Sequence, residues 1–173
     1  MRRPLFVITA SLFALSACGG APEKGAPVAG ASSFKATDAC AILSKEKVAA
    51  ATGLKVEEAK LSSVTPATAS TPGFSACTYV FAEGGTLGFY ARQSPEADTS
   101  ETVAQTRKAL TEGMGAKIAD VAGIGTSAFS AQPMDQFHVF FGGDKYIYFM
   151  IDRAPITKPF LEVERTLANA VIG

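Results

Sequence analysis

The chain is poor in the residue types that most often carry catalysis or metal binding. It contains one histidine and three cysteines, and its 16 basic residues equal its 16 acidic residues in number. It has no basic block that would attract nucleic acid and no polybasic patch for anionic lipid. P-loop, zinc and calcium-loop spacings are also missing from the sequence. The sequence therefore predicts no cofactor, no metal site and no nucleic-acid partner.

The single histidine, His138, lies in the apolar run Phe137-His138-Val139-Phe140-Phe141. Strand alternation places it on the face of Gln136 and Phe140, opposite Phe137. An acid/base role would need a nucleophile and an orienting partner, and the sequence allows no such set to be assigned. We interpret His138 as a structural or exposed strand residue, which makes an envelope hydrolase the least favoured function.

The first 17 residues have the layout of an export signal. Arg2 and Arg3 precede an apolar run over residues 5–15, which is shorter than the about 20 residues that span a bilayer. The run leads into Leu15-Ser16-Ala17-Cys18, which resembles the lipobox of bacterial lipoproteins. The resemblance implies that residues 1–17 are removed as a signal peptide and that Cys18 carries a diacylglyceryl group on its sulfur. The alternatives are an ordinary signal peptide with an incidental cysteine, or a retained N-terminal helix.

The resemblance also implies where the mature chain is held. Lipid on Cys18 would tie it to a membrane, because each buried CH₂ contributes about 0.8 kcal/mol and two or more chains anchor stably. Gly19 and Gly20 follow Cys18 without an aspartate, so the family's inner-membrane retention signal is missing. We expect export and lipid anchoring in the cell envelope, on the periplasmic face of the outer membrane where two membranes exist. Residues 18–33, rich in Gly, Ala, Pro and Ser, are expected to form a flexible tether.

Cys40 and Cys77 are the two thiols that remain once Cys18 carries lipid. An isolated pair in an oxidising compartment is expected to form a disulfide. A redox pair is more usually Cys-x-x-Cys, a zinc site needs more ligands, and a catalytic thiol needs a histidine base. Asp-x-Cys-x-Ile-Leu-Ser at 38–44, with a later Cys-Thr-Tyr at 77–79, is similar to exported lipoproteins of unknown function. In those proteins the first cysteine bridges a helix to a strand.

Residues 34–173 are expected to form a single α+β domain, a largely antiparallel sheet with helices packed on it. Helices are expected over 38–43, over 44–52 with a stop at Gly53, from a capping box at 98–101 to about 112, and after a cap at Thr157. Strands are expected over 55–61, 74–82, 86–92, 117–121, 126–131, 137–141 and 145–152. Residues 62–73 are expected to form a polar loop.

The two halves of this domain resemble each other. Residues 53–58 match 115–120, and the hairpin glycines at 84–85 match those at 142–143. This pattern suggests two βββα repeats after an N-terminal helix, with chance similarity between short apolar strands as the alternative. Gly123-Ile124-Gly125 opens a formal G-x-G-x-x-A, but the residues after it are typical of a strand and not of a helix N-terminus. We therefore predict a turn there and no dinucleotide site.

An aromatic stripe is the richest feature left, and two interpretations of it stay open. Phe137, Phe140, Tyr146 and Tyr148 either line the packed interior of the sheet or form a face that holds a ligand or partner. The first function hypothesis is a non-catalytic binding or accessory module for an envelope protein. The alternative is a small-molecule or lipid carrier using this aromatic face, which a sizeable apolar cavity would favour.

Overall fold

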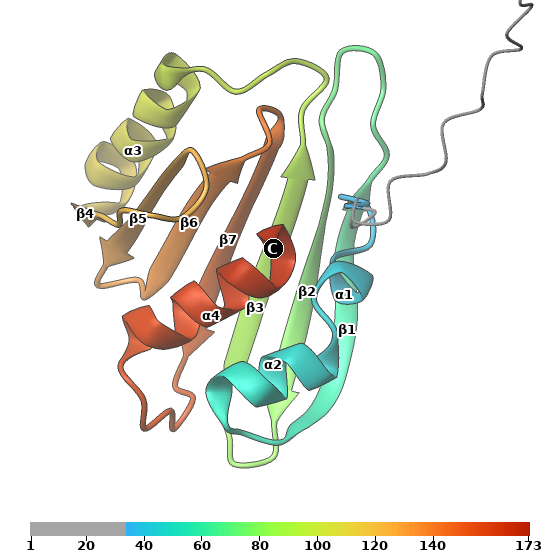
Figure 1. The fold of residues 1–173 in the computed structure, drawn as a ribbon, viewed down its shortest axis with the longest axis vertical. Coiled ribbons are helices and arrows are strands. Elements are labelled where there is room, and N and C mark those ends of the chain that lie inside the picture. Colours follow the sequence, from blue (N-terminus) through green and yellow to red (C-terminus); the bar gives the residue numbers. More distant parts are fainter. Residues whose placement is uncertain (1–33) are drawn as a thin grey trace, which may run out of the picture. The chain divides into compact units, whose positions relative to one another are not determined.

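A computed structural model describes residues 34–173. Outside the described residues lie the predicted signal peptide, 1–17, and the predicted tether with its predicted lipidation site Cys18, 18–33. The described chain forms one seven-stranded antiparallel sheet in the order β1-β2-β3-β7-β6-β5-β4 (Figure 1). Four helices pack on this sheet, so the predicted α+β class is confirmed. None of the helices within residues 34–173 is long and apolar enough to cross a membrane.

The elements follow one another along the chain as two helices, three strands, a helix, four strands and a last helix. The helices are α1 (Ala39–Ile42), α2 (Lys45–Thr52), α3 (Ser100–Met114) and α4 (Phe160–Ile172). The strands are β1 (Val56–Thr65), β2 (Gly73–Phe81), β3 (Thr86–Gln93), β4 (Lys117–Asp120), β5 (Ser127–Gln132), β6 (Gln136–Phe141) and β7 (Lys145–Asp152).

The sheet buries apolar side chains on both faces, under different helices. Helices α1, α2 and α4 cover one face, which we call the first face (Figure 1), and their core includes Phe149 and Leu167. Helix α3 packs on the opposite face, the second face, where its Leu110 joins Phe140 and Tyr146. Because successive strand residues point to opposite faces, β7 supplies both cores from one run of apolar residues. The two-sided apolar pattern of this strand therefore reflects two separate helical layers.

Local capping explains most helix boundaries. The side chains of Asp38 and Ser44 accept from backbone N–H groups of α1 and α2, and Gly53 ends α2 in the left-handed conformation, as predicted. The capping box of α3 differs from the expectation, because Thr99 and Thr102 form it. The carboxylate of Asp98, expected at that position, pairs with Arg92 instead.

Helix α4 and strand β1 also differ from the sequence prediction. The expected cap at Thr157 is wrong, since α4 follows Pro159 and has no side-chain cap. Strand β1 continues to Thr65, through residues expected to form a loop, because β2 remains beside it and pairs with Val64 and Thr65 after a bulge near Ser63. Backbone pairing across the sheet outweighs the polar, proline-flanked local sequence there.

The two halves share their hairpins but differ in other respects from the suggested repeat. Hairpins β2–β3 and β6–β7 lie on either side of the central β3–β7 pair. The second half has a fourth strand, so the sequence match at 53–58 and 115–120 aligns the two edge strands β1 and β4. The helices that end the halves, α3 and α4, cover opposite faces. The halves are therefore not equivalent as whole βββα units.

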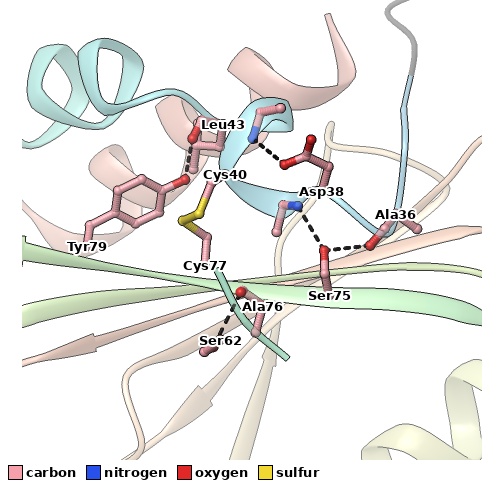
Figure 2. Close-up of a disulfide and its surroundings, with 11 residues drawn as sticks. Ala36, Asp38, Cys40, Leu43, Ser62, Ser75, Ala76, Cys77 and Tyr79 are labelled. Carbon is pink, nitrogen blue, oxygen red and sulfur yellow. Dashed lines mark hydrogen bonds between the residues drawn. A yellow bond between two sulfur atoms is a disulfide. The ribbon is translucent and has the colours of Figure 1, made fainter. Parts of the chain in front are cut away.

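Three side chains of β2 hold the start of the domain on the first face (Figure 2). Cys77 forms the predicted disulfide with Cys40 of α1, across a Cα–Cα distance of 5.2 Å. Ser75 accepts from the backbone N–H of Ala39 at 2.8 Å and donates to the carbonyl of Ala36 at 2.7 Å. Tyr79 donates its hydroxyl to the carbonyl of Leu43.

The three side chains are spaced by two residues, so the alternation of β2 presents them in one line on one face. We call Ser75, Cys77 and Tyr79 the anchor row. All three side chains are fully buried. Each therefore makes its hydrogen bonds or its covalent bond to residues 36–43 out of contact with water. The anchor row therefore fixes the segment through which the chain enters the domain.

We predict that reduction of the Cys40–Cys77 disulfide lowers the free energy of unfolding by about 4 kcal/mol, because the bond closes a loop of this length in the unfolded chain. Urea unfolding with and without a reductant measures the loss. The double variant Cys40→Ser/Cys77→Ser is the matched control, and its stability should equal that of the reduced protein and not respond to reductant. Equal stability of the oxidised and reduced protein would contradict the prediction.

Candidate functional site

Five aromatic rings form a continuous row across five adjacent strands on the second face. The row runs Phe74 of β2, Tyr90 of β3, Tyr148 of β7, His138 of β6 and Phe129 of β5. Successive ring centroids are 5.5, 5.0, 5.3 and 4.9 Å apart, and the rings of each pair are inclined by no more than 31°. Four of the rings, from Tyr90 to Phe129, therefore stack along the sheet, and Phe74 is tilted against Tyr90. We call the five rings the aromatic row.

The register of the sheet explains this row. Tyr90 lies directly opposite Tyr148, Tyr148 opposite His138, and His138 opposite Phe129. Directly opposed residues on one face of an antiparallel sheet have side chains close enough to touch. The central β3–β7 pair therefore joins the aromatic residues of the two halves into one surface.

Helix α3 covers only one end of the aromatic row. Phe129 and His138, at the β5–β6 end, are buried, whereas Tyr148, Tyr90 and Phe74 are partly exposed. Met150 of β7, on the same face, is 41% exposed. The second face is thus a helix-covered half over β5 and β6 and an open half over β2, β3 and β7.

The structure separates the four residues predicted to share a ligand or partner face. Phe140, Tyr146 and Tyr148 lie on the second face, and the first two are buried in the core with α3. Phe137 points to the first face, is fully buried there and cannot contact the same ligand. Tyr148 is the partly exposed member of the predicted set.

Sequence reasoning missed Phe74 and Tyr90, which complete the open end of the row. Their positions on alternating strands indicate which face they share within the β2–β3 hairpin. The contact of Tyr90 with Tyr148 depends on the pairing of β3 with β7, two strands more than 50 residues apart in sequence. No local signal in the sequence specifies that pairing.

His138 is held by two neutral partners inside the second-face core. Its Nδ1 lies 2.6 Å from the hydroxyl of Tyr146, and its Nε2 lies 3.1 Å from Oε1 of Gln136. Because a carbonyl oxygen only accepts, we assign the proton to Nε2, and Nδ1 then accepts from Tyr146. Burial lowers the pKa of His138 to about 4 and raises that of Tyr146. Both ring nitrogens are thus engaged in a neutral, structural network.

A partly buried ion pair continues this network toward α3. The guanidinium of Arg92 lies 5.0 Å from the ring centroid of Tyr146 and 2.5 Å from Oδ1 of Asp98. Nε of Arg92 and Oδ2 of Asp98 are buried without a hydrogen-bond partner among residues 34–173. Removing two charges from water is costly, and an unsatisfied oxygen adds to that cost. The pair is therefore a place where a bound group could add a missing hydrogen bond.

The residues Gly123-Ile124-Gly125 form a turn between β4 and β5, as predicted. Gly125 has φ of +58°, and a side chain there would place Cβ 2.3 Å from the carbonyl oxygen of Phe140. Strand β5 follows, so this turn presents no helix N-terminus to a pyrophosphate. Within residues 34–173, no three His, Cys, Asp or Glu side chains gather in an arrangement that could hold a metal ion.

The first face contains a buried acid that sequence reasoning did not single out. Glu164 of α4 is buried, and the carboxylate of Asp135 in the β5–β6 turn lies near enough to act on it. Burial, with a smaller contribution from the charge of Asp135, raises the pKa of Glu164 to about 7. Its position on the apolar face of α4, between Val163 and Leu167, is compatible with a protonated carboxyl.

We predict that Glu164→Gln stabilises the domain at pH 8 by up to about 3 kcal/mol and leaves it unchanged near pH 4.5. The folded state raises the pKa of Glu164 from 4.5 to about 7, so the native protein loses stability as the pH rises through this window. Urea unfolding at the two pH values measures the difference. Glu162→Gln, at an exposed site on the same helix, is the control and should show no gain at pH 8.

His138→Gln should have the opposite dependence on pH. The folded state lowers the pKa of His138 from 6.5 to about 4, so the native protein loses stability as the pH falls through that window. We predict that the variant is less stable than the parent at pH 7, by about 1 to 2 kcal/mol from the lost hydrogen bonds. The deficit should shrink or vanish at pH 4. A deficit that is equal at both pH values would show that His138 titrates normally.

No protein-family model, no curated protein and no solved structure matches the chain. The site therefore has to be interpreted from its own geometry.

Proposed function

We propose that the protein is a lipid-anchored lipoprotein of the cell envelope, and that its domain is a non-catalytic binding module for an envelope protein. The lipobox-like sequence ending at Cys18 supports the anchor, and the predicted tether 18–33 would let the domain reach a partner near the membrane. The open half of the second face supports the binding role. It is the observation on which the proposal depends.

The composition of the open half favours a protein as the partner. Tyr90, Tyr148 and Met150 project from a floor of small residues, Ala76, Thr78 and Gly88, on the neighbouring strands. Tyrosine and methionine are enriched where proteins meet, because each combines a large contact area with adaptable chemistry. An open sheet face with projecting aromatic side chains suits a broad protein surface better than a small ligand.

The stacking of the aromatic row argues against a sugar as the partner. Carbohydrates are recognised on the open faces of aromatic rings, but Tyr90 and Tyr148 stack against each other with centroids 5.0 Å apart. Their faces are therefore engaged within the row, and ring edges and hydroxyl groups remain to meet a partner. Such groups serve the polar and apolar contacts of a protein interface.

The alternative function, a small-molecule or lipid carrier using the aromatic sheet face, has less support. A carrier would hold an acyl chain in an apolar cavity. The first-face core is filled by large side chains, among them Phe89 and Phe149, which are buried and stack with centroids 5.2 Å apart. The second-face core is closed by α3 over Phe129 and Phe140.

The proposal is tested first at Cys18. We expect the mature protein to begin at Cys18 and to carry fatty chains, as measured by the intact mass of the protein purified from its membranes. Cys18→Ser should remove the added mass and release the protein from the membrane fraction. A mature chain that begins at another residue, or that carries no fatty chain, would remove the envelope-anchor part of the proposal.

The binding surface is tested by crosslinking and recovery of partners from intact cells. We expect Met150→Arg to reduce the recovered partner by about tenfold or more, because it would bury an unpaired charge in the interface. Met114→Arg is the matched control, since Met114 is exposed at the end of α3, away from the open half. Equal recovery with both variants would mean that the partner binds another surface.

A further inference from the structure

A groove lies between the first turns of α3 and the strands beside it, separate from the open half of the second face. Its volume is about 560 Å³, within the range of small-molecule sites. We call it the α3 groove. It is lined by Thr99, Ser100, Val103, Ala104 and Arg107 on the helix side, and by Asp98, Asp120, Thr126, Ser127, Phe140 and Gly143 around it.

One end of the α3 groove has a negative charge with an unsatisfied oxygen. The side chain of Asp98 is only 7% exposed, and its Oδ1 is bonded to Arg92. Its Oδ2 is buried and has no hydrogen-bond partner in the described part of the chain. The backbone N–H of Asp98 donates to the carbonyl of Gly143, which holds the residue at the mouth of the groove. A donor brought by a ligand would satisfy Oδ2 without breaking the bond to Arg92.

The other end of the α3 groove has a positive charge with a weakly held partner. The guanidinium of Arg107 lies 4.4 Å from the ring centroid of Phe129, which fixes it over the aromatic row. Its ion-pair partner, Asp120, is 78% exposed at the edge strand β4. An exposed pair of this kind contributes little, so an incoming anion can replace Asp120 on Arg107 at small cost.

The two charged ends are separated by an apolar middle. Val103 and Ala104 of α3 face the groove, with Phe140 on the sheet side. Ser100 and Arg107 are seven residues apart on the helix, a rise of about 10 Å, and helical side chains lean back toward the N-terminus. An apolar wall between two charged ends suits a molecule with a short aliphatic chain between its own charges.

We propose that the α3 groove binds a small zwitterion, with an ammonium group on Asp98, a carboxylate on Arg107 and an apolar chain along Val103 and Ala104. The inference is independent of the proposed partner surface, because Tyr90, Tyr148 and Met150 do not line this groove. Because the two ends of the groove carry opposite charges, we expect the groove to prefer neither a simple amine nor a simple acid. Recognition of both ends by one ligand sets its length as well as its charge.

Three probes of equal chain length test this charge pattern by calorimetric titration of the full-length protein. They are 6-aminohexanoate, which has both charges, hexylamine, which has the positive charge, and hexanoate, which has the negative charge. We expect 6-aminohexanoate to bind at least about tenfold more tightly than either singly charged probe, since each charged hydrogen bond is worth about that factor or more. Equal binding of all three, or no binding up to about 10 mM, overturns the proposal.

Three substitutions assign the binding to the two ends and the middle. Asp98→Asn should weaken 6-aminohexanoate and hexylamine by about tenfold and leave hexanoate unchanged, while Arg107→Gln should weaken 6-aminohexanoate and hexanoate and leave hexylamine unchanged. Because Asp98 also pairs with Arg92, its variant has to be checked for an intact fold by its unfolding transition. Ala104→Trp fills the groove from an exposed helix position and keeps both charges. Binding of 6-aminohexanoate that survives Ala104→Trp unchanged places it elsewhere and overturns the proposal.

Discussion

The anchor row on β2 is the constraint on which the rest of the domain depends. Ser75, Cys77 and Tyr79 attach residues 36–43 to the sheet by two kinds of bond, hydrogen bonds to the backbone and a disulfide. With this segment fixed, α1 and α2 cover β1 and β2 on the first face (Figure 1). Helix α4 alone would leave this part of the sheet uncovered. The anchored helices thereby bury most of the first face, whereas on the second face β2 and β3 carry no helix.

The pairing of β3 with β7 determines what that open surface presents. It joins the β2–β3 hairpin to the β6–β7 hairpin, and in doing so it brings Tyr90 against Tyr148. Helix α3 follows β3 and crosses to the second face, where it covers β5 and β6 and leaves β2 and β3 open. One crossing therefore produces both the α3 groove and the uncovered aromatic surface beside it.

Local signals in the sequence predict much of this fold. The caps at Asp38 and Ser44, the stop at Gly53 and the turn at Gly125 all depend on the conformational needs of single residues, and each is present. The continuation of β1 to Thr65 and the role of Asp98 do not follow from local sequence, because both depend on a distant neighbour, β2 and Arg92 respectively. Phe137 and Phe140 show the same limit of sequence-based prediction in the site. Strand alternation places them on opposite faces, but whether each face is buried or open depends on the helices that pack on it.

The distribution of tyrosine has a spectroscopic consequence. The chain has no tryptophan and four tyrosines, so its near-ultraviolet absorption and its emission come mainly from tyrosine. Tyr79 is sealed in the anchor row, whereas Tyr90, Tyr146 and Tyr148 gather on the second face within 6.3 Å of one another by centroid distance. Three of the four tyrosines therefore lie on the second face. Changes in the intrinsic fluorescence or near-ultraviolet circular dichroism of the unlabelled protein should come mainly from events on that side of the sheet.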